Sequence, residues 1–179
     1  MTRRLVYLIG APGAGKTTLM RALTARYARV PAAGQPARDY LADPRTGLIV
    51  AAELGRRRGT FSGTDALPMN AITAAERWLR TQHQTDVVLA EGARLANARF
   101  LAAATDAGYA VTLAYLEHPH TDSWRAARTE ALRTAPQNEA WVRGRATAAR
   151  NLAEHPPAGV RVVRGHPDTV RPEVEVQLP

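Results

Sequence analysis

A glycine-rich segment, residues 10–18 (GAPGAGKTT), follows a short apolar run and precedes a helical pattern, and this order of elements constrains the fold more than any other feature. Residues 4–9 (RLVYLI) predict a buried strand. Leu19, Leu23 and Tyr27 recur at helical spacing and predict a helix over residues 17–28. Glycines let the intervening backbone turn tightly and direct its N–H groups at an anion, to which the helix N-terminus adds its partial positive charge. The segment therefore predicts a strand–loop–helix unit that binds phosphate.

The same segment matches G-x-x-x-x-G-K-[ST], the phosphate-binding loop (P-loop) of nucleoside triphosphatases. Among 24 lysines and arginines the only lysine is Lys16, and a wide guanidinium cannot replace a compact ammonium among phosphate oxygens. We predict that Lys16 contacts the β and γ phosphates of ATP and that the Thr17 hydroxyl coordinates Mg²⁺. The alternative is a glycine-rich turn that precedes the helix by chance. The predicted nucleotide-binding residues are Gly10, Ala11, Pro12, Gly13, Ala14, Gly15, Lys16, Thr17 and Thr18.

Length and composition narrow the remaining possibilities. A chain of 179 residues predicts one domain over residues 1–179. Cysteine is absent, which excludes disulfides and thiolate metal sites. No segment is typical of a signal peptide or a membrane span, so we expect a cytoplasmic protein with no membrane partner. The net charge of +8 indicates an anionic partner, either nucleotides or nucleic acid, although a GC-rich genome also enriches arginine.

Strand and helix patterns alternate along the rest of the chain. Predicted strands cover residues 47–54, 86–90, 109–116 and 160–163, and predicted helices cover residues 68–83, 95–107 and 121–154, the last with a break at Pro136. Residues 30–44 are rich in Pro, Ala and Gly and are interpreted as a connection. This alternation predicts a three-layer α/β P-loop domain with a mainly parallel sheet of about five strands.

The chain resembles the small P-loop kinases, which include nucleoside monophosphate, gluconate, shikimate and polynucleotide kinases. The resemblance lies in the size, the phosphate loop near the N-terminus and an arginine-rich helical segment late in the chain. It implies a mobile helical lid over about residues 121–154. The strings LGRRRGTFSGTDALPM and EGARLANARF also resemble bacteriophage P-loop proteins, some of which phosphorylate hydroxymethylated pyrimidines in phage DNA. No N-K-x-D guanine signature is present, which argues against a signalling GTPase.

Two carboxylates follow predicted strands, at the sheet edge where ligands bind. Asp65 comes after a glycine-flanked segment, where the resembled kinases often carry an acceptor-binding Asp, and capping of a helix is the alternative. Glu91 ends the strand DVVLA, where a carboxylate holds Mg²⁺ or serves as base, and an ion pair with Arg94 is the alternative. The resembled kinases more often carry Asp at this position. We predict catalytic roles for both.

Arginines gather in the predicted lid. Arg125 and Arg128 are three residues apart, so on a helix they face the same way, and we predict that they clamp a phosphate and stabilise the transition state. Arg143 and Arg150 share another face, and the alternative for each arginine is a solvated charge. Trp124 and Trp141 are expected to pack, the histidines show no zinc-ligand spacing, and residues 165–167 lie where related kinases bind adenine through the backbone.

The sequence thus predicts an ATP- and Mg²⁺-dependent kinase that phosphorylates a hydroxyl of a nucleotide or of a modified nucleotide in DNA. Residues 56–58, three arginines in a row, and the lid arginines would hold the anionic acceptor. Two alternatives stay open: a kinase of a small non-nucleotide metabolite, and an ATPase that regulates a partner without phosphoryl transfer.

Overall fold

A seven-stranded sheet forms the centre of the computed structural model, which describes residues 2–57, 62–131, 133, 135 and 137–179. Its strand order is β2-β3-β4-β7-β1-β8-β9. The last five strands of that order run parallel to one another: β4 (Ile49–Leu54), β7 (Val87–Glu91), β1 (Arg3–Gly10), β8 (Tyr109–Leu116) and β9 (Val160–Gly165). The predicted mainly parallel sheet is confirmed.

Two further strands extend the sheet beyond β4, and there the sequence interpretation was wrong. The strands β2 (Ala28–Pro31) and β3 (Arg38–Ala42) form an antiparallel hairpin that pairs with β4 through β3. Most of this hairpin lies in residues 30–44, the segment interpreted as a connection, and Ala28 lies at the end of the segment predicted as the first helix, which ends at Thr24. The edge strand β2 has only four residues, all exposed or half-buried, and it ends in proline. Such a strand carries no apolar alternation, because edge strands are kept short and polar and tolerate proline.

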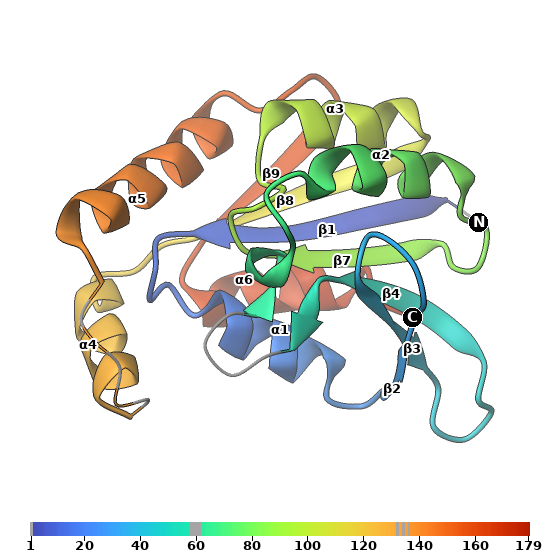
Figure 1. The fold of residues 1–179 in the computed structure, drawn as a ribbon, viewed down its shortest axis with the longest axis horizontal. Helices are drawn as coiled ribbons and strands as arrows, with labels where there is room; N and C mark the ends of the chain where they lie inside the picture. The colour runs from blue at the N-terminus through green and yellow to red at the C-terminus, as the bar shows by residue number, and fades with distance from the viewer. Residues whose placement is uncertain (1, 58–61, 132, 134, 136) are drawn as a thin grey trace.

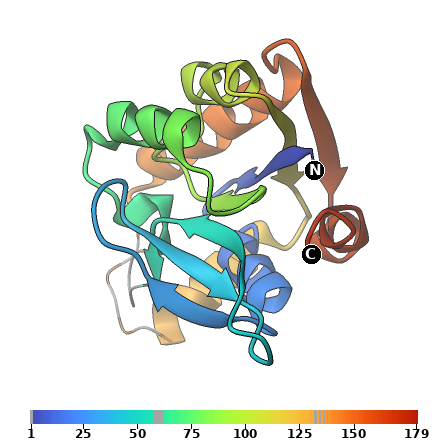
Figure 2. The ribbon, with the colours of Figure 1, turned by 90° about the vertical axis from the view of Figure 1, so that its right-hand side faces the viewer.

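Helices cover both faces of the sheet, as Figures 1 and 2 show. One apolar cluster gathers Leu5, Tyr7 and Ile9 of β1 with residues of α2 (Ala71–Thr81), α3 (Ala98–Asp106) and α5 (Glu139–Glu154). The other gathers Val6 and Leu8 with residues of α1 (Lys16–Thr24) and α6 (Pro167–Glu175). Alternate residues of one strand thus enter opposite layers, which is why β1 appears in the sequence as a continuous apolar run. The three-layer arrangement is confirmed.

The long helix predicted for residues 121–154 is divided into α4 (Thr121–Ala131) and α5. The amide oxygen of Asn138 caps α5 by accepting from Trp141 N at 3.0 Å, while Pro136 lies outside the described residues. Helix α6 was not predicted. It begins at Pro167, is capped by His166 and contains Pro172, so its sequence has few helix-forming signals and depends on packing beside α1.

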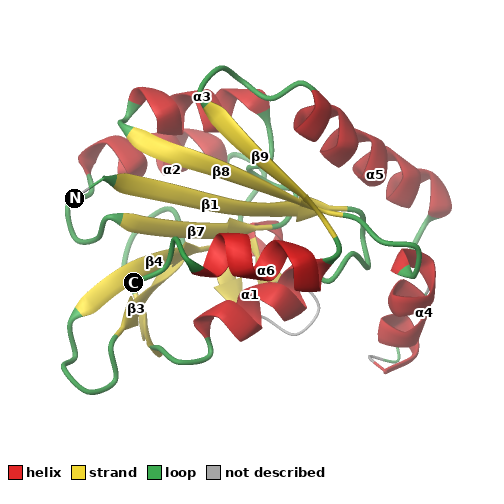
Figure 3. Cartoon of the chain, turned by 180° about the vertical axis from the view of Figure 1, so that it is seen from behind, coloured by secondary structure: helices red, strands yellow, loops and turns green. Residues whose placement is uncertain are grey.

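The topology brings several loops to one edge of the sheet. Strands β7 and β8 flank β1 in the sheet, although both come much later in the chain. The loops after β7 and β8 therefore lie on either side of the loop that follows β1, and ligands bind at such a position in open α/β sheets. A short hairpin of β5 (Arg56–Arg57) and β6 (Ser62–Gly63), followed by the 3₁₀ turn η1 (Thr64–Ala66), also lies at this edge. Figure 3 shows α4 and the start of α5 beyond the same edge. Among the described residues, no helix is long and apolar enough to cross a membrane.

Candidate active site

The loop between β1 and α1 adopts a tight, glycine-dependent turn. Gly13 and Gly15 have φ angles of 92° and 84°, in the left-handed region that favours glycine. The Lys16 ammonium donates to the carbonyl oxygens of Gly10 at 3.0 Å and Ala11 at 2.8 Å. Lysine therefore lies inside the turn, among the backbone groups that the sequence predicts to surround phosphate.

The start of α4, in the segment predicted as the lid, and the start of α6 lie directly on this loop. A Cβ atom added at Gly13 would come within 2.5 Å of Thr121 O and 2.8 Å of the Arg125 Cβ. One added at Gly15 would lie 3.2 Å from Pro167 and 3.3 Å from the Trp124 ring. The expected packing role of Trp124 thus takes a definite form, a contact between α4 and the phosphate loop. These glycines permit close packing as well as the turn.

Glu91 lies beside the first turn of α1. Its Oε1 accepts from the Thr17 hydroxyl at 3.0 Å and from the Ser62 hydroxyl at 3.3 Å. The side chain is only 3% exposed, and this burial raises the pKa of the Glu91 carboxyl, an effect that the Lys16 charge and the Thr17 hydroxyl partly offset. The predicted pair of Thr17 and Glu91 is therefore brought together, although the chain separates them by 74 residues.

The oxygens gathered at this point fit Mg²⁺. Hydroxyl oxygens of Thr17 and Ser62 lie 3.2 Å apart, and both contact the Glu91 carboxylate. Mg²⁺ takes oxygen ligands and uses few protein groups, because water and substrate phosphates complete its shell. When bound, the ion would supply positive charge for the nucleotide phosphates. Ser62 was not predicted, because a single serine in a short glycine-rich segment has no sequence feature that marks it as a ligand.

The alternative interpretation of Asp65, that it caps the following helix, is wrong, because Asp65 does not cap α2. Its Oδ1 accepts from the backbone N–H of Ala93 at 2.8 Å, and the residue that precedes α2 is Asn70. A Cβ at Gly92 would lie 2.9 Å from Asp65 Oδ2, so the carboxylate occupies space that a side chain there would fill. Asp65 is half-buried beside Glu91, and its role toward an acceptor remains a prediction.

A buried hydrogen-bonded chain supports these two carboxylates. The Thr64 hydroxyl donates to the Glu91 carbonyl oxygen at 2.9 Å and lies 3.1 Å from the Tyr7 hydroxyl. Burial raises the pKa of the Tyr7 phenol well above its usual range, so this group stays neutral. Neither residue was predicted, since both look like ordinary core or turn residues in the sequence. These hydrogen bonds link β1, η1 and β7 and hold Asp65 and Glu91 on one side of the phosphate loop.

The predicted arginines have different surroundings. The Arg125 guanidinium lies 3.2 Å from both Asp122 and Glu139 and so connects α4 to α5. The side chains of Arg57 and Arg128, and all of Arg58, lie outside the described residues. Arg56 is exposed in β5. The clamp predicted for Arg125 and Arg128 therefore remains a prediction.

The alternative ion pair of Glu91 with Arg94 does not form in the described structure. An Arg94 Nη1 contacts the Met69 sulfur, and its Nε is buried with no hydrogen-bond partner among the described residues. The Glu91 carboxylate instead accepts hydrogen bonds from the Thr17 and Ser62 hydroxyls.

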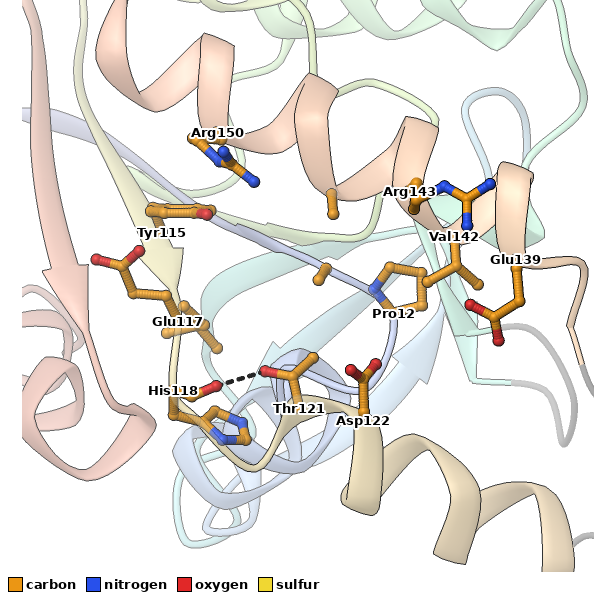
Figure 4. Close-up of a pocket in the computed structure, with 13 residues that line it drawn as sticks. Pro12, Tyr115, Glu117, His118, Thr121, Asp122, Glu139, Val142, Arg143 and Arg150 are labelled. Carbon is orange, nitrogen blue, oxygen red and sulfur yellow. Dashed lines mark hydrogen bonds between the residues drawn. The ribbon is translucent and has the colours of Figure 1, made fainter.

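A cavity of about 430 Å³ opens beside the loop, between the ends of β1 and β8 and the helix α5 (Figure 4). Pro12 contributes from the phosphate loop, Tyr115 and Glu117 from the end of β8, and Arg143 and Arg150 from α5. The shared face that the sequence predicts for these two arginines is thus the face that lines the cavity.

A comparison with curated protein sequences found no match. A family model described as P-loop Nucleotide Kinase3 matches residues 1–178, and this match extends from β1, before the phosphate loop, through α4 and α5 to α6. Because it covers nearly the whole chain and agrees with the observed fold, the chain belongs to the P-loop Nucleotide Kinase3 family, a family of kinase-type P-loop enzymes that bind nucleotides.

Proposed function

We propose that the protein is an ATP-dependent kinase that transfers the γ-phosphoryl group to a hydroxyl of a nucleotide, or of a modified nucleotide within DNA. One observation carries the proposal. Two carboxylates, Asp65 and Glu91, lie side by side next to the phosphate loop, and each has separate hydrogen-bond partners. Phosphoryl transfer needs one group for the metal and another for the acceptor hydroxyl, and the pair supplies both.

Each residue has a distinct task in this proposal. The loop N–H groups and Lys16 hold the β and γ phosphates, and Thr17 and Glu91 hold Mg²⁺. Asp65 Oδ1 is anchored by Ala93 N–H, so Oδ2 accepts the hydroxyl proton of the acceptor. The acceptor oxygen then bonds to the γ phosphorus as the bond to the β–γ bridging oxygen breaks, and ADP leaves. Arg125 and Arg128 would neutralise the transferred group from the lid side.

The positive charge and the bacteriophage-like strings support an acceptor in DNA. The net charge is +8, and arginines occur both in the β5 region and in the lid. A polymeric acceptor would contact several of these cations through successive phosphates, and each contact releases condensed counterions. Within this class we propose hydroxymethylated pyrimidines, whose added hydroxyl is a suitable phosphoryl acceptor.

The test is a transfer screen with γ-labelled ATP and Mg²⁺. Nucleosides, nucleotides, sugars, unmodified DNA and DNA with hydroxymethylated pyrimidines are offered separately, and the labelled product is identified. We expect transfer to a nucleotide-type hydroxyl and its loss in Asp65→Asn. Phosphate release without transfer to any acceptor would instead identify an ATPase, and transfer only to sugars would identify a metabolite kinase.

Salt dependence separates the two forms of the acceptor. With about four phosphate contacts, raising salt from roughly 50 to 200 mM should lower affinity for DNA by about two orders of magnitude. A free nucleotide makes one or two such contacts and should show a shallow dependence. If neither single-stranded nor duplex DNA bound detectably at the lower salt concentration, a polymeric acceptor would be ruled out.

A further inference from the structure

One buried hydroxyl that the proposed reaction does not use belongs to Tyr7, on the strand that leads into the phosphate loop. The residue is fully buried, and its ring packs edge-on against Phe100 of α3, with ring centres 6.1 Å apart and planes at 89°. Its neighbours on the same face of β1, Leu5 and Ile9, are aliphatic. A phenylalanine would supply the same apolar surface, and burying a hydroxyl is costly unless it is hydrogen-bonded. The contacts of the Tyr7 oxygen therefore need an explanation.

The direction of the hydrogen bonds at this oxygen follows from a count of protons. Thr64 has one hydroxyl proton, and it donates this proton to the Glu91 carbonyl oxygen at 2.9 Å. A carbonyl oxygen can only accept, so Thr64 has no second proton to donate to Tyr7. In the 3.1 Å contact between the two hydroxyls, Tyr7 is therefore the donor and Thr64 the acceptor. The hydrogen bonds run in one direction from β1 through η1 to the last residue of β7.

The segments that these hydrogen bonds join carry the two proposed catalytic carboxylates, Asp65 in η1 and Glu91 at the end of β7. The segments lie in direct contact, because glycines occupy positions between them. A Cβ atom added at Gly63 would lie 2.5 Å from Glu91 O, and one added at Gly92 would lie 2.9 Å from Thr64 Oγ1. With no side chain at these two positions, a shift of one segment against the other moves one carboxylate relative to the other.

Asp65 depends on both segments for its position. Its backbone follows directly after Thr64, and its carboxylate accepts from the backbone N–H of Ala93 at 2.8 Å. The backbone N–H of Leu95, two residues after Ala93, interacts with the Tyr7 oxygen. The Tyr7 hydroxyl thus contacts the segment that carries Asp65 as well as the segment that anchors its carboxylate.

We propose that Tyr7 is a positioning residue for phosphoryl transfer: its hydroxyl holds η1 against the loop after β7 and so fixes Asp65 relative to the bound γ-phosphate. The same strand ends at Gly10, the first residue of the phosphate loop, so β1 sets the position of the donor and of the group that receives the acceptor proton. The proposal rests on the proposed kinase function and deepens it. Tyr7 itself contacts no substrate in this proposal, and its effect on the reaction passes through Asp65.

Tyr7→Phe tests the proposal, because it removes the hydroxyl and keeps the ring. Tyr109→Phe is the matched control. Tyr109 is also buried in the same apolar cluster, and its hydroxyl contacts Gln82 and Arg3. It begins β8, opposite Arg3 and at the end of the sheet away from the phosphate loop. Both variants lose a buried hydrogen-bonded hydroxyl, and we expect both to be less stable than wild type in denaturant unfolding.

The first measurement requires no reaction. Hydrogen exchange, followed by NMR, reports how firmly the Ala93 N–H is held by Asp65. We expect this amide to exchange at least about fivefold faster in Tyr7→Phe, which corresponds to the loss of one hydrogen bond from the contact between the segments. In Tyr109→Phe its exchange should match wild type, which excludes a general loss of stability as the cause.

The second measurement uses the acceptor identified by the transfer screen. A misplacement of about 1 Å can cost about 100-fold in rate, so kcat for transfer should fall by between about tenfold and 100-fold in Tyr7→Phe. Affinity for a non-hydrolysable ATP analogue should be nearly unchanged, because Lys16 and Thr17 belong to α1 on the opposite face of the sheet (Figure 2). Tyr109→Phe should retain both values.

A double-mutant cycle shows whether Tyr7 acts through Asp65. In the Asp65→Asn background the group to be positioned is already lost, so Tyr7→Phe should cause little further loss of kcat. An equal loss in both backgrounds would show that Tyr7 affects transfer by another route. If Tyr7→Phe does not fold, Thr64→Ser and Thr64→Val are compared, and the serine variant, which keeps the hydroxyl, should have the slower Ala93 exchange and the faster transfer.

The two measurements separate this proposal from the kinase function. Unchanged Ala93 exchange in folded Tyr7→Phe, or unchanged kcat, would overturn the positioning role of Tyr7. If wild type transferred phosphate to no acceptor while Ala93 exchange rose in Tyr7→Phe alone, the kinase function would be overturned and the role of Tyr7 in holding Asp65 would stand.

Discussion

Glu91→Gln tests the proposed metal site most directly. The variant keeps an oxygen able to accept from Thr17 and Ser62, which lie 3.0 and 3.3 Å from Glu91 Oε1, so the main change is the loss of charge. A charged contact of this kind contributes about 1.5–3 kcal/mol, which corresponds to roughly ten- to hundredfold in affinity. We therefore expect Mg²⁺-dependent ATP binding to weaken by at least about tenfold.

The raised pKa of Glu91 adds a pH dependence with a definite sign. Below that pKa a proton competes with Mg²⁺, so wild-type affinity should rise by about tenfold per pH unit and then level off once pH exceeds the pKa. The free energy of unfolding of the metal-free protein should change in the opposite sense. Because the folded-state pKa exceeds the unfolded value, the stability contribution is present below the unfolded pKa and is lost as pH rises through the folded pKa. The Gln variant should show neither effect.

The assay titrates Mg²⁺ at fixed ATP between about pH 5 and 8, and denaturant unfolding without metal follows the stability. ATP itself takes up a proton near pH 6, but it does so with both proteins, so the difference between wild type and variant isolates Glu91. Equal pH slopes of Mg²⁺ affinity in the two proteins would refute the assignment of Glu91 as the metal-binding carboxylate.

Substitutions at three further positions, with one control position, test other parts of the site. Lys16→Ala should abolish turnover without unfolding the protein, and Lys16→Arg should be severely impaired; full turnover of the arginine variant would show that the geometry of the lysine is unimportant. Asp65→Asn should slow transfer by about 10²- to 10⁴-fold with ATP binding nearly unchanged, and equal losses by calorimetry would contradict its acceptor role. Gly63→Ala places a Cβ 2.5 Å from Glu91 O at a φ of 63°, so it should cost more than the roughly 1–3 kcal/mol of backbone strain alone. Gly47→Ala, with a φ of 72° and nothing within 4 Å, is its control in denaturant unfolding, and an equal cost would show that the close contact has no effect.

Local sequence patterns were sufficient to predict the parallel strands of the sheet and most of the helices. Strand β8 was predicted with its observed limits, because a buried parallel strand is a continuous apolar run. The hairpin β2–β3 and helix α6 were missed, since an exposed edge strand and a short helix containing Pro172 have little local signal. Their formation depends on the sheet edge and on α1, which lie elsewhere in the chain.

The sequence by itself determined the strand–loop–helix unit, the lone Lys16 within it and the placement of Glu91 at a strand end, because each follows from residue types at fixed short spacing. Only the tertiary structure decided that Ser62 shares the Glu91 carboxylate with Thr17, and that Asp65 binds Ala93 N–H instead of capping a helix. It also decided that Arg143 and Arg150 line a cavity, while Arg125 forms ion pairs with Asp122 and Glu139. The physical reason is that these contacts join residues far apart in the chain, and the direction of a side chain is set by the packing of whole elements.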